Sequence, residues 1–216
     1  VSVCHPPSRP SNARPGAREA IRCTLGTPDG ATVIVMAARM EAWKGHRTLL
    51  ESAARLPDRG WELWIAGGAH GAGEQAYLDA LKVQGSALGG RVRFVGEQHD
   101  VEAWLQAADV YCQPNRGPEP FGLAFVEALS AGLPVVTSAI GAAPEIVDAT
   151  CGVLTEPDSA PAVSAALRTL IDDEAARARL SAGARVRARE FCDLPRALAR
   201  LAEAIGQVGS ASLVLT

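Results

Sequence analysis

Two cationic residues, Arg39 and Lys44, follow the first apolar run of the sequence and precede a segment with helical spacing. Unpaired N–H groups at the start of a helix attract anions, and two cations beside them complete a receptor for a diphosphate. Taken alone, the pair is also consistent with ordinary solvated charges. It indicates a diphosphate site only if other functional residues converge on the same loop.

Two carboxylates, Glu119 and Glu127, flank a second junction between a loop and a helical segment. Gly122 between them permits close approach of the backbone to a ligand. Glu127 is an acid in an otherwise apolar helix, where burying an unpaired carboxylate is costly. A helical path would separate the pair by roughly 12 Å, which suits two groups gripping hydroxyls at opposite ends of one extended ligand. The alternative is a loop charge and a surface position on a helix.

The elements that must position these residues alternate between strand and helix. The predicted strands are residues 32–38, 61–66, 92–95, 110–113, 134–138 and 152–154. The predicted helices are residues 17–25, 46–56, 74–88, 101–108, 123–131, 161–171, 173–191 and 195–206. This alternation predicts an α/β fold with a doubly wound parallel sheet, Rossmann-like and covered on both faces. In such sheets ligands bind beyond the carboxyl ends of the strands, where the loops described above lie.

Length and composition indicate one well-buried domain. Hydrophobic residues make up 48% of the 216 residues and charged residues 21%, a balance that disordered chains lack. We expect a leader or interdomain segment with a short helix over residues 1–30, the main domain over 31–194, and a C-terminal helix and tail over 195–216. The formal charge of −3 offers no concentrated basic surface, so nucleic acid is not expected as a partner.

No signal for membrane insertion or disulfide bonding is present in the sequence. The apolar runs are shorter than the roughly 20 residues that span a bilayer, and residues 1–10 contain three prolines and no apolar core, unlike a signal peptide. The five cysteines are widely spaced and form no CxxC pair. Reduced thiols and a cytoplasmic location are therefore expected.

A series of motifs runs through the chain in a fixed order. It comprises Arg39 with Lys44-Gly45, Gly67-Gly68, residues 92–96, residues 119–122 with Glu127, residues 132–136 and residues 144–147. This series resembles the carboxyl-terminal domain of the retaining glycosyltransferases of the GT-B fold, family four, often called glycosyl transferases group one. The resemblance runs from about residue 17 to about residue 204. Two departures are Ala38, where the family usually has glycine, and Pro120, where glycine is commoner.

The resemblance implies a role for each matching side chain. Arg39 and Lys44 would hold the diphosphate of the donor and neutralise the charge that builds on it as the glycosidic bond breaks. Glu119 would bind hydroxyls of the donor sugar, and Glu127 would accept hydrogen bonds from the ribose. The positive charges of Arg39 and Lys44 would replace a metal ion, so neither a metal nor another cofactor is expected.

The resemblance also implies contacts through the backbone. The strand end at Phe94, Val95 and Gly96 would lie beside the nucleobase. The N–H groups of Phe121, Gly122 and Leu123 would meet the sugar and the distal phosphate.

The function expected from this resemblance is donor binding in a retaining hexosyltransferase that takes a UDP- or GDP-sugar. Its acceptor would be a carbohydrate or a lipid-linked molecule. Family members bind the acceptor with an amino-terminal domain, which is missing here, so the chain alone should be inactive. Peripheral membrane association of the full enzyme remains open.

Two alternatives remain, a non-catalytic nucleotide-sugar-binding module and a nucleotide-sugar 2-epimerase-like enzyme. The epimerase would need further acidic and histidine groups. A Rossmann dehydrogenase is not expected, because no GxGxxG motif follows the first strand.

Overall fold

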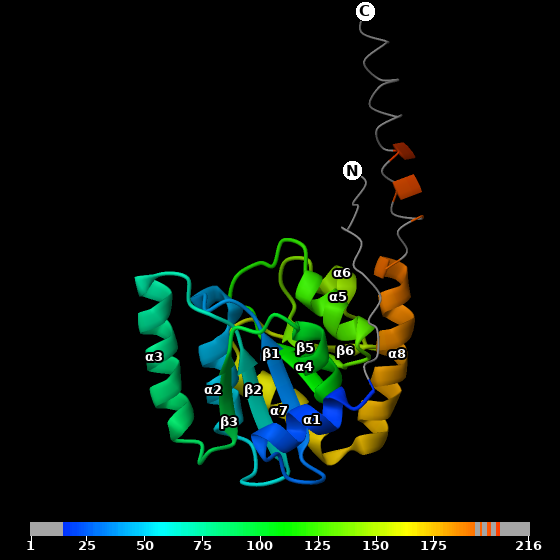
Figure 1. Ribbon diagram of the computed structural model, residues 1–216. Coiled ribbons are helices and arrows are strands. Elements are labelled where there is room, and N and C mark those ends of the chain that lie inside the picture. Colours follow the sequence, from blue (N-terminus) through cyan, green and yellow to red (C-terminus); the bar gives the residue numbers. More distant parts are fainter. Residues whose placement is uncertain (1–14, 193–194, 196–197, 200–201, 204–216) are drawn as a thin grey trace, which may run out of the picture.

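A computed structural model describes residues 15–192, 195, 198–199 and 202–203 (Figure 1). Six parallel strands form one sheet in the order β3-β2-β1-β4-β5-β6. The strands are β1 (Thr32–Ala37), β2 (Trp61–Ala66), β3 (Val92–Gly96), β4 (Val110–Gln113), β5 (Val135–Ser138) and β6 (Gly152–Thr155). The predicted α/β fold is confirmed, and the chain order reverses between β1 and β4.

Helices cover both faces of the sheet. They are α1 (Ala17–Leu25), α2 (His46–Ala53), α3 (Ala72–Ser86), α4 (Val101–Ala107), α5 (Leu123–Ser130), α6 (Ala143–Ile146), α7 (Ala160–Asp172) and α8 (Glu174–Cys192). The sheet places alternate residues on opposite faces. Val33 and Val35 of β1 pack with α4, α5 and α8, whereas Ile34 and Met36 pack with α2 and α7.

Some predicted helix bounds are wrong. The helix that begins at His46 ends at Ala53 and not at residue 56, because the chain tightens before Pro57. The N–H groups of Arg55 and Leu56 there donate to carbonyls only three residues back. Helix α3 begins two residues before its predicted start. Most of the predicted helix 195–206 lies outside the described residues.

Two short elements were not predicted. Helix α6 has only four residues and contains Pro144, so it is too short to show helical periodicity. The 3₁₀ helix η1 (Ala42–Lys44) is shorter still. Both lie in loops at the carboxyl edge of the sheet, where they shape the chain around the predicted site.

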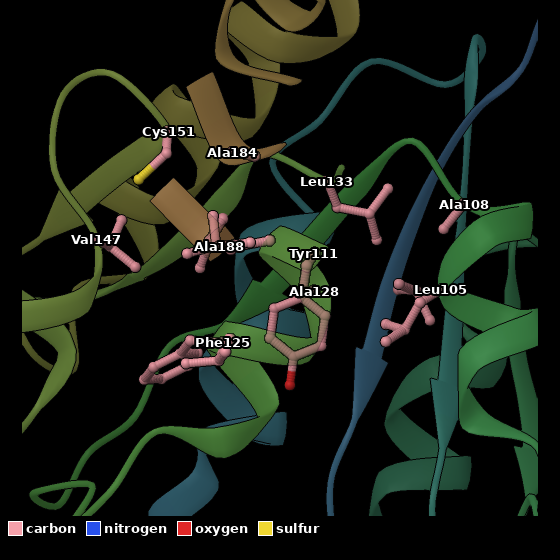
Figure 2. Packing of buried hydrophobic residues seen from close by; sticks show 14 of the residues in the cluster. Leu105, Ala108, Tyr111, Phe125, Ala128, Leu133, Val147, Cys151, Ala184 and Ala188 are labelled. Atoms are coloured by element: carbon pink, nitrogen blue, oxygen red, sulfur yellow. The ribbon is translucent and has the colours of Figure 1, made fainter. Parts of the chain in front are cut away.

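A large apolar cluster lies beneath the helix that carries Glu127. Tyr111 of β4 and Phe125 of α5 meet edge to face, with ring centroids 6.4 Å apart. Figure 2 shows both rings among Leu105, Val147 and their neighbours. This packing fixes α5 against the end of β4, and thereby fixes the loop between them.

Candidate functional site

The loop after β1 holds its two cations in different environments. The side chain of Arg39 is 62% exposed and pairs with Glu41 at 3.2 Å. Lys44 closes η1, and only 13% of its side chain is exposed. Arg39 is therefore accessible to a ligand, whereas most of the Lys44 side chain is buried.

Lys44 meets Glu119 although 75 positions separate them in the sequence. Lys44 Nζ donates to Glu119 Oε2 at 2.7 Å, and it also lies 4.0 Å from the centroid of the Trp43 ring. The two loops are tied together by the Arg116 N–H, which donates to the Trp43 carbonyl at 2.7 Å. The structure thus brings together two of the predicted site residues.

Two glycines allow this close approach of backbones. Gly45 has φ of +87°, and a Cβ atom there would lie 1.9 Å from the Pro114 carbonyl oxygen. Gly141 has φ of +63°, and a Cβ there would lie 2.4 Å from the Glu119 nitrogen. The Ala142 N–H donates to the Glu119 carbonyl at 2.8 Å. Neither glycine has room for a side chain, and both adopt a conformation that favours glycine.

The start of α5 presents free donors beside these residues. Gly122 is the N-cap with φ of +68° and no side chain to satisfy the helix end. Its carbonyl accepts from the N–H groups of Phe125 and Val126. The N–H groups before them have no partner within the helix, as at every helix start. The side chains of Phe121 and Leu123 are 60% and 42% exposed, so this edge is open to a ligand.

A cavity of about 220 Å³ adjoins Arg39 at the carboxyl ends of β1, β2 and β3. Arg39, in the loop after β1, and Glu127, in α5, both line it, and so do Gly67 and Gly68 after β2. Gly67 is required here because a Cβ would lie 2.0 Å from the Ala38 carbonyl oxygen. The remaining lining residues are Ala37, Ala38, Ala66, His70, Glu97, Gln98 and Val101.

The residues that follow β3, and not the end of the strand itself, line this cavity. Phe94 packs against α3, and the carbonyl of Val95 accepts from Gln98 Nε2 at 2.6 Å. The carbonyl of Gly96 accepts from Gly67 N–H of the neighbouring strand end. Glu97 and Gln98 line the cavity in their place. The strand motif ends at Gly96, and nothing in the sequence pattern distinguishes the two residues after it.

The charges of Glu127 and Glu119 both act on a buried tyrosine, Tyr111. Glu127 is exposed at the mouth of the cavity, yet the surrounding protein displaces water and raises the pKa of its carboxyl. Burial raises the pKa of Tyr111 well above its usual value, and the charges of Glu127 and then Glu119 raise it further. Tyr111 is therefore neutral and keeps its proton for donation.

Two buried amides at this site were not predicted from the sequence. Gln113 and Asn115 are both 0% exposed. Gln113 Nε2 donates to Asn115 Oδ1 at 2.8 Å, and Gln113 Oε1 accepts from the Tyr111 hydroxyl at 2.7 Å. Both amides approach Glu119 Oε2, at 3.4 Å and 3.5 Å. Polar residues at the end of a buried strand could have drawn attention to this pair.

The described part of the chain contains neither a metal-binding cluster nor a membrane-spanning helix. No group of three or more His, Cys, Asp and Glu residues there is placed to hold a metal ion. No described helix is both long enough and apolar enough to cross a bilayer.

The family model described as glycosyl transferases group 1 matches residues 17–187, which include every residue of the site above. The chain belongs to this family. The match extends from α1 into α8, so it spans the whole sheet of this group 1 domain.

Curated relatives of this group 1 domain are about twice its length. D-inositol 3-phosphate glycosyltransferase of Xylanimonas cellulosilytica is 35% identical over 190 residues, covering 86% of this chain and 44% of the relative. Phosphatidyl-myo-inositol mannosyltransferase of Mycolicibacterium smegmatis is 34% identical over 170 residues, covering 76% of this chain and 42% of the relative. The chain thus corresponds to less than half of each.

Among solved structures, this chain covers about half of one protein and almost all of an isolated domain of another. HepE of Anabaena, in complex with UDP and glucose, superposes with a TM-score of 0.82 and 29% identity, covering 91% of this chain and 53% of that one. The C-terminal domain of the group 1 protein LpcC of Francisella tularensis superposes with a TM-score of 0.72 and 24% identity, covering 96% of that domain. The group 1 sheet described here is one Rossmann-like half of a GT-B fold.

His46, the residue after Gly45, is buried beneath the cation loop of this group 1 domain. It is 0% exposed, and its ring meets Tyr77 edge to face with centroids 5.9 Å apart. Neither ring nitrogen makes a hydrogen bond with the described residues. Burial lowers the pKa of His46 from 6.5 to about 4, although the nearby Glu41 and Ala38 carbonyls favour its protonated form. His46 is therefore a neutral packing residue of this loop at neutral pH.

This burial predicts a pH-dependent stability. The unfolded chain binds a proton at His46 near pH 6.5 and the folded chain only near pH 4, so stability should fall as pH falls through that interval. The full loss is about 3 kcal/mol if the shift is complete. Urea unfolding at pH 7 and pH 5 should show a smaller loss for His46→Leu than for the natural chain. Equal losses in both chains would contradict the assignment.

Proposed function

We propose that this chain is the donor-binding half of a retaining hexosyltransferase that takes a UDP- or GDP-sugar. The observation that carries the proposal is the meeting of Lys44 and Glu119 at 2.7 Å, beside the uncapped start of α5. A cation, a carboxylate and free N–H groups converge there from two loops. A diphosphate linked to a sugar offers the complementary groups: anionic oxygens for the cation and helix start, and hydroxyls for the carboxylate.

Within this proposal, the cavity beside Arg39 receives the nucleoside. Glu127 lines that cavity and would accept hydrogen bonds from the ribose hydroxyls. Arg39 lines the same cavity and is exposed, so it can reach the diphosphate between the nucleoside and Lys44. HepE, which binds UDP and UDP-glucose in its solved complexes, shares this fold at 28–29% identity and so supports the choice of ligand class.

As the leaving nucleoside diphosphate separates from the sugar, negative charge builds on its distal phosphate. Lys44, Arg39 and the start of α5 would stabilise that charge. We therefore propose that transfer needs no metal ion. Glu119, which lies beside Lys44, would hold the sugar while its glycosidic bond breaks.

The acceptor side of the reaction would belong to a second domain. The relatives are about twice as long as this chain, and their names describe transfer to inositol-containing molecules. We propose that a carbohydrate or lipid-linked acceptor binds such a domain, and that the site is completed when the two halves close. The isolated chain should then bind donor but transfer no sugar.

The division of labour between the two glutamates tests this proposal. Glu127→Ala should weaken UDP and UDP-glucose alike, by roughly ten- to a hundredfold, since it removes a hydrogen bond to a charged group. Glu119→Ala should weaken UDP-glucose by a similar factor and leave UDP nearly unchanged. Calorimetric titration with UDP, UDP-glucose, GDP and GDP-mannose measures four affinities for each variant.

The matched control is Glu51→Ala, which removes an exposed carboxylate from α2. It should leave all affinities unchanged. Equal weakening of UDP by both site variants would contradict the assignment of Glu119 to the sugar. No effect from either would show that neither glutamate contacts the ligand.

A further inference from the structure

The pairing of Lys44 with Glu119 creates a problem that the proposed function must solve. If Lys44 turns toward the diphosphate of a donor, Glu119 loses its closest partner, and only 12% of its side chain is exposed to water. An ionised carboxylate left without partners in such a place is strongly unfavourable. Other donors must therefore support Glu119 when the donor is bound.

Two amides are poised for that role. Gln113 Nε2 lies 3.4 Å and Asn115 Nδ2 3.5 Å from Glu119 Oε2, the same oxygen that Lys44 contacts. These are long contacts, at the limit of hydrogen bonding, as expected while Lys44 holds the carboxylate. All three of these side-chain contacts are made by Glu119 Oε2 and none by Oε1. One oxygen thus faces protein donors and the other is available to a ligand.

Tyr111 fixes the direction in which these amides point. Its buried hydroxyl donates to Gln113 Oε1 at 2.7 Å, with the Ala37 carbonyl as a second acceptor at 3.2 Å. An amide whose oxygen accepts from Tyr111 must turn its N–H groups the other way, toward Asn115 and Glu119. The reversed amide would place an oxygen against the carboxylate, which is repulsive.

We propose that Tyr111, Gln113 and Asn115 form a positioning relay that holds Glu119 when Lys44 leaves it for the donor diphosphate. This inference rests on the proposed function and adds residues to which that proposal gives no role. The relay acts through Glu119 and touches no part of the donor itself. It should therefore weaken UDP-glucose, whose sugar Glu119 is proposed to bind, more strongly than UDP.

The test is the preference of the chain for UDP-glucose over UDP, measured by calorimetry. Gln113→Met keeps the volume and removes both donors, and it should reduce that preference about tenfold while weakening UDP itself by a smaller factor. Tyr111→Phe removes only the hydroxyl from a packed ring and should reduce the preference by about threefold. The second variant keeps the test valid if Gln113→Met does not fold.

Thr137→Val is the matched control. The Thr137 hydroxyl donates to the backbone carbonyl of Gln113 at 2.8 Å and is as buried as the relay, yet it does not contact Glu119. Its loss should lower stability and leave the preference for UDP-glucose unchanged. An effect equal to that of Gln113→Met would reduce the relay to a general structural role and overturn the inference.

A double-mutant cycle with Glu119→Gln separates positioning from packing. If Gln113 acts through the Glu119 carboxylate, Gln113→Met should change the preference less than twofold in the Glu119→Gln background. A full tenfold effect there would overturn the inference. So would a natural chain that binds UDP but holds UDP-glucose no more tightly. A natural chain that binds neither UDP nor GDP would instead overturn the proposed function.

Discussion

Replacing Gly45 with alanine is expected to destabilise the domain by about 2 to 5 kcal/mol and to abolish binding of UDP and GDP. The added Cβ would lie 1.9 Å from the oxygen and 2.6 Å from the carbon of the Pro114 carbonyl. If the backbone at Gly45 or at Pro114 moved to relieve this clash, the loop of Lys44 would separate from the loop of Glu119. The φ of +87° at Gly45 adds strain for any residue with a side chain.

Gly90→Ala is the matched control for this prediction. Gly90 has φ of +79°, and a Cβ there would meet no atom within 4 Å. The Gly90→Ala variant should lose only about 1 kcal/mol of stability, which is the strain of the left-handed conformation. Urea unfolding and UDP titration of both variants give the comparison. If Gly45→Ala matches Gly90→Ala in stability and still binds UDP, the contact between the loops is not needed for the site.

The second large effect is expected from Lys44→Met. This variant keeps the length of the side chain and removes the charge that faces both Glu119 and the proposed diphosphate. The lost contact alone accounts for roughly a ten- to hundredfold weakening of UDP. The uncompensated Glu119 would then repel the phosphate, so we expect a loss of more than about a hundredfold.

A double variant distinguishes the two contributions. Lys44→Met combined with Glu119→Gln removes the repelling carboxylate, and it should bind UDP more tightly than Lys44→Met alone. Lys82→Met, on exposed positions of α3, controls for the change in net charge and should bind UDP normally. Unchanged UDP affinity in Lys44→Met would show that Lys44 is a structural partner of Glu119 and not a phosphate ligand.

The strands and the convergence of two loops could be predicted because they depend on local pattern and general topology. The apolar run of β1 identified a strand buried on both faces, and the carboxyl ends of parallel strands share one edge. The positions of Arg39 and Lys44 at that edge could therefore be predicted from the sequence alone. The contact of Lys44 with Glu119 needed the structure, because side-chain positions across two loops are not encoded in spacing.

The remaining features depend on contacts between distant segments. Gly141 contacts Glu119 because the loop after β5 meets the loop after β4. The presence of a glycine in the sequence does not show which distant residue it will contact. Gln113 and Asn115 flank a proline at the end of β4, and their orientation depends on Tyr111 below them. Such networks are defined by tertiary packing, so sequence alone indicates at most that buried amides need partners.

The most direct test of the donor-binding account is a calorimetric titration of the chain with UDP and with GDP in buffer containing EDTA. We expect one nucleoside diphosphate to bind at a single site per chain, with the same affinity after magnesium is added in excess of EDTA, and Lys44→Met to lose that binding. Absence of binding by both nucleotides, or binding that appears only when the metal is restored, would contradict the account.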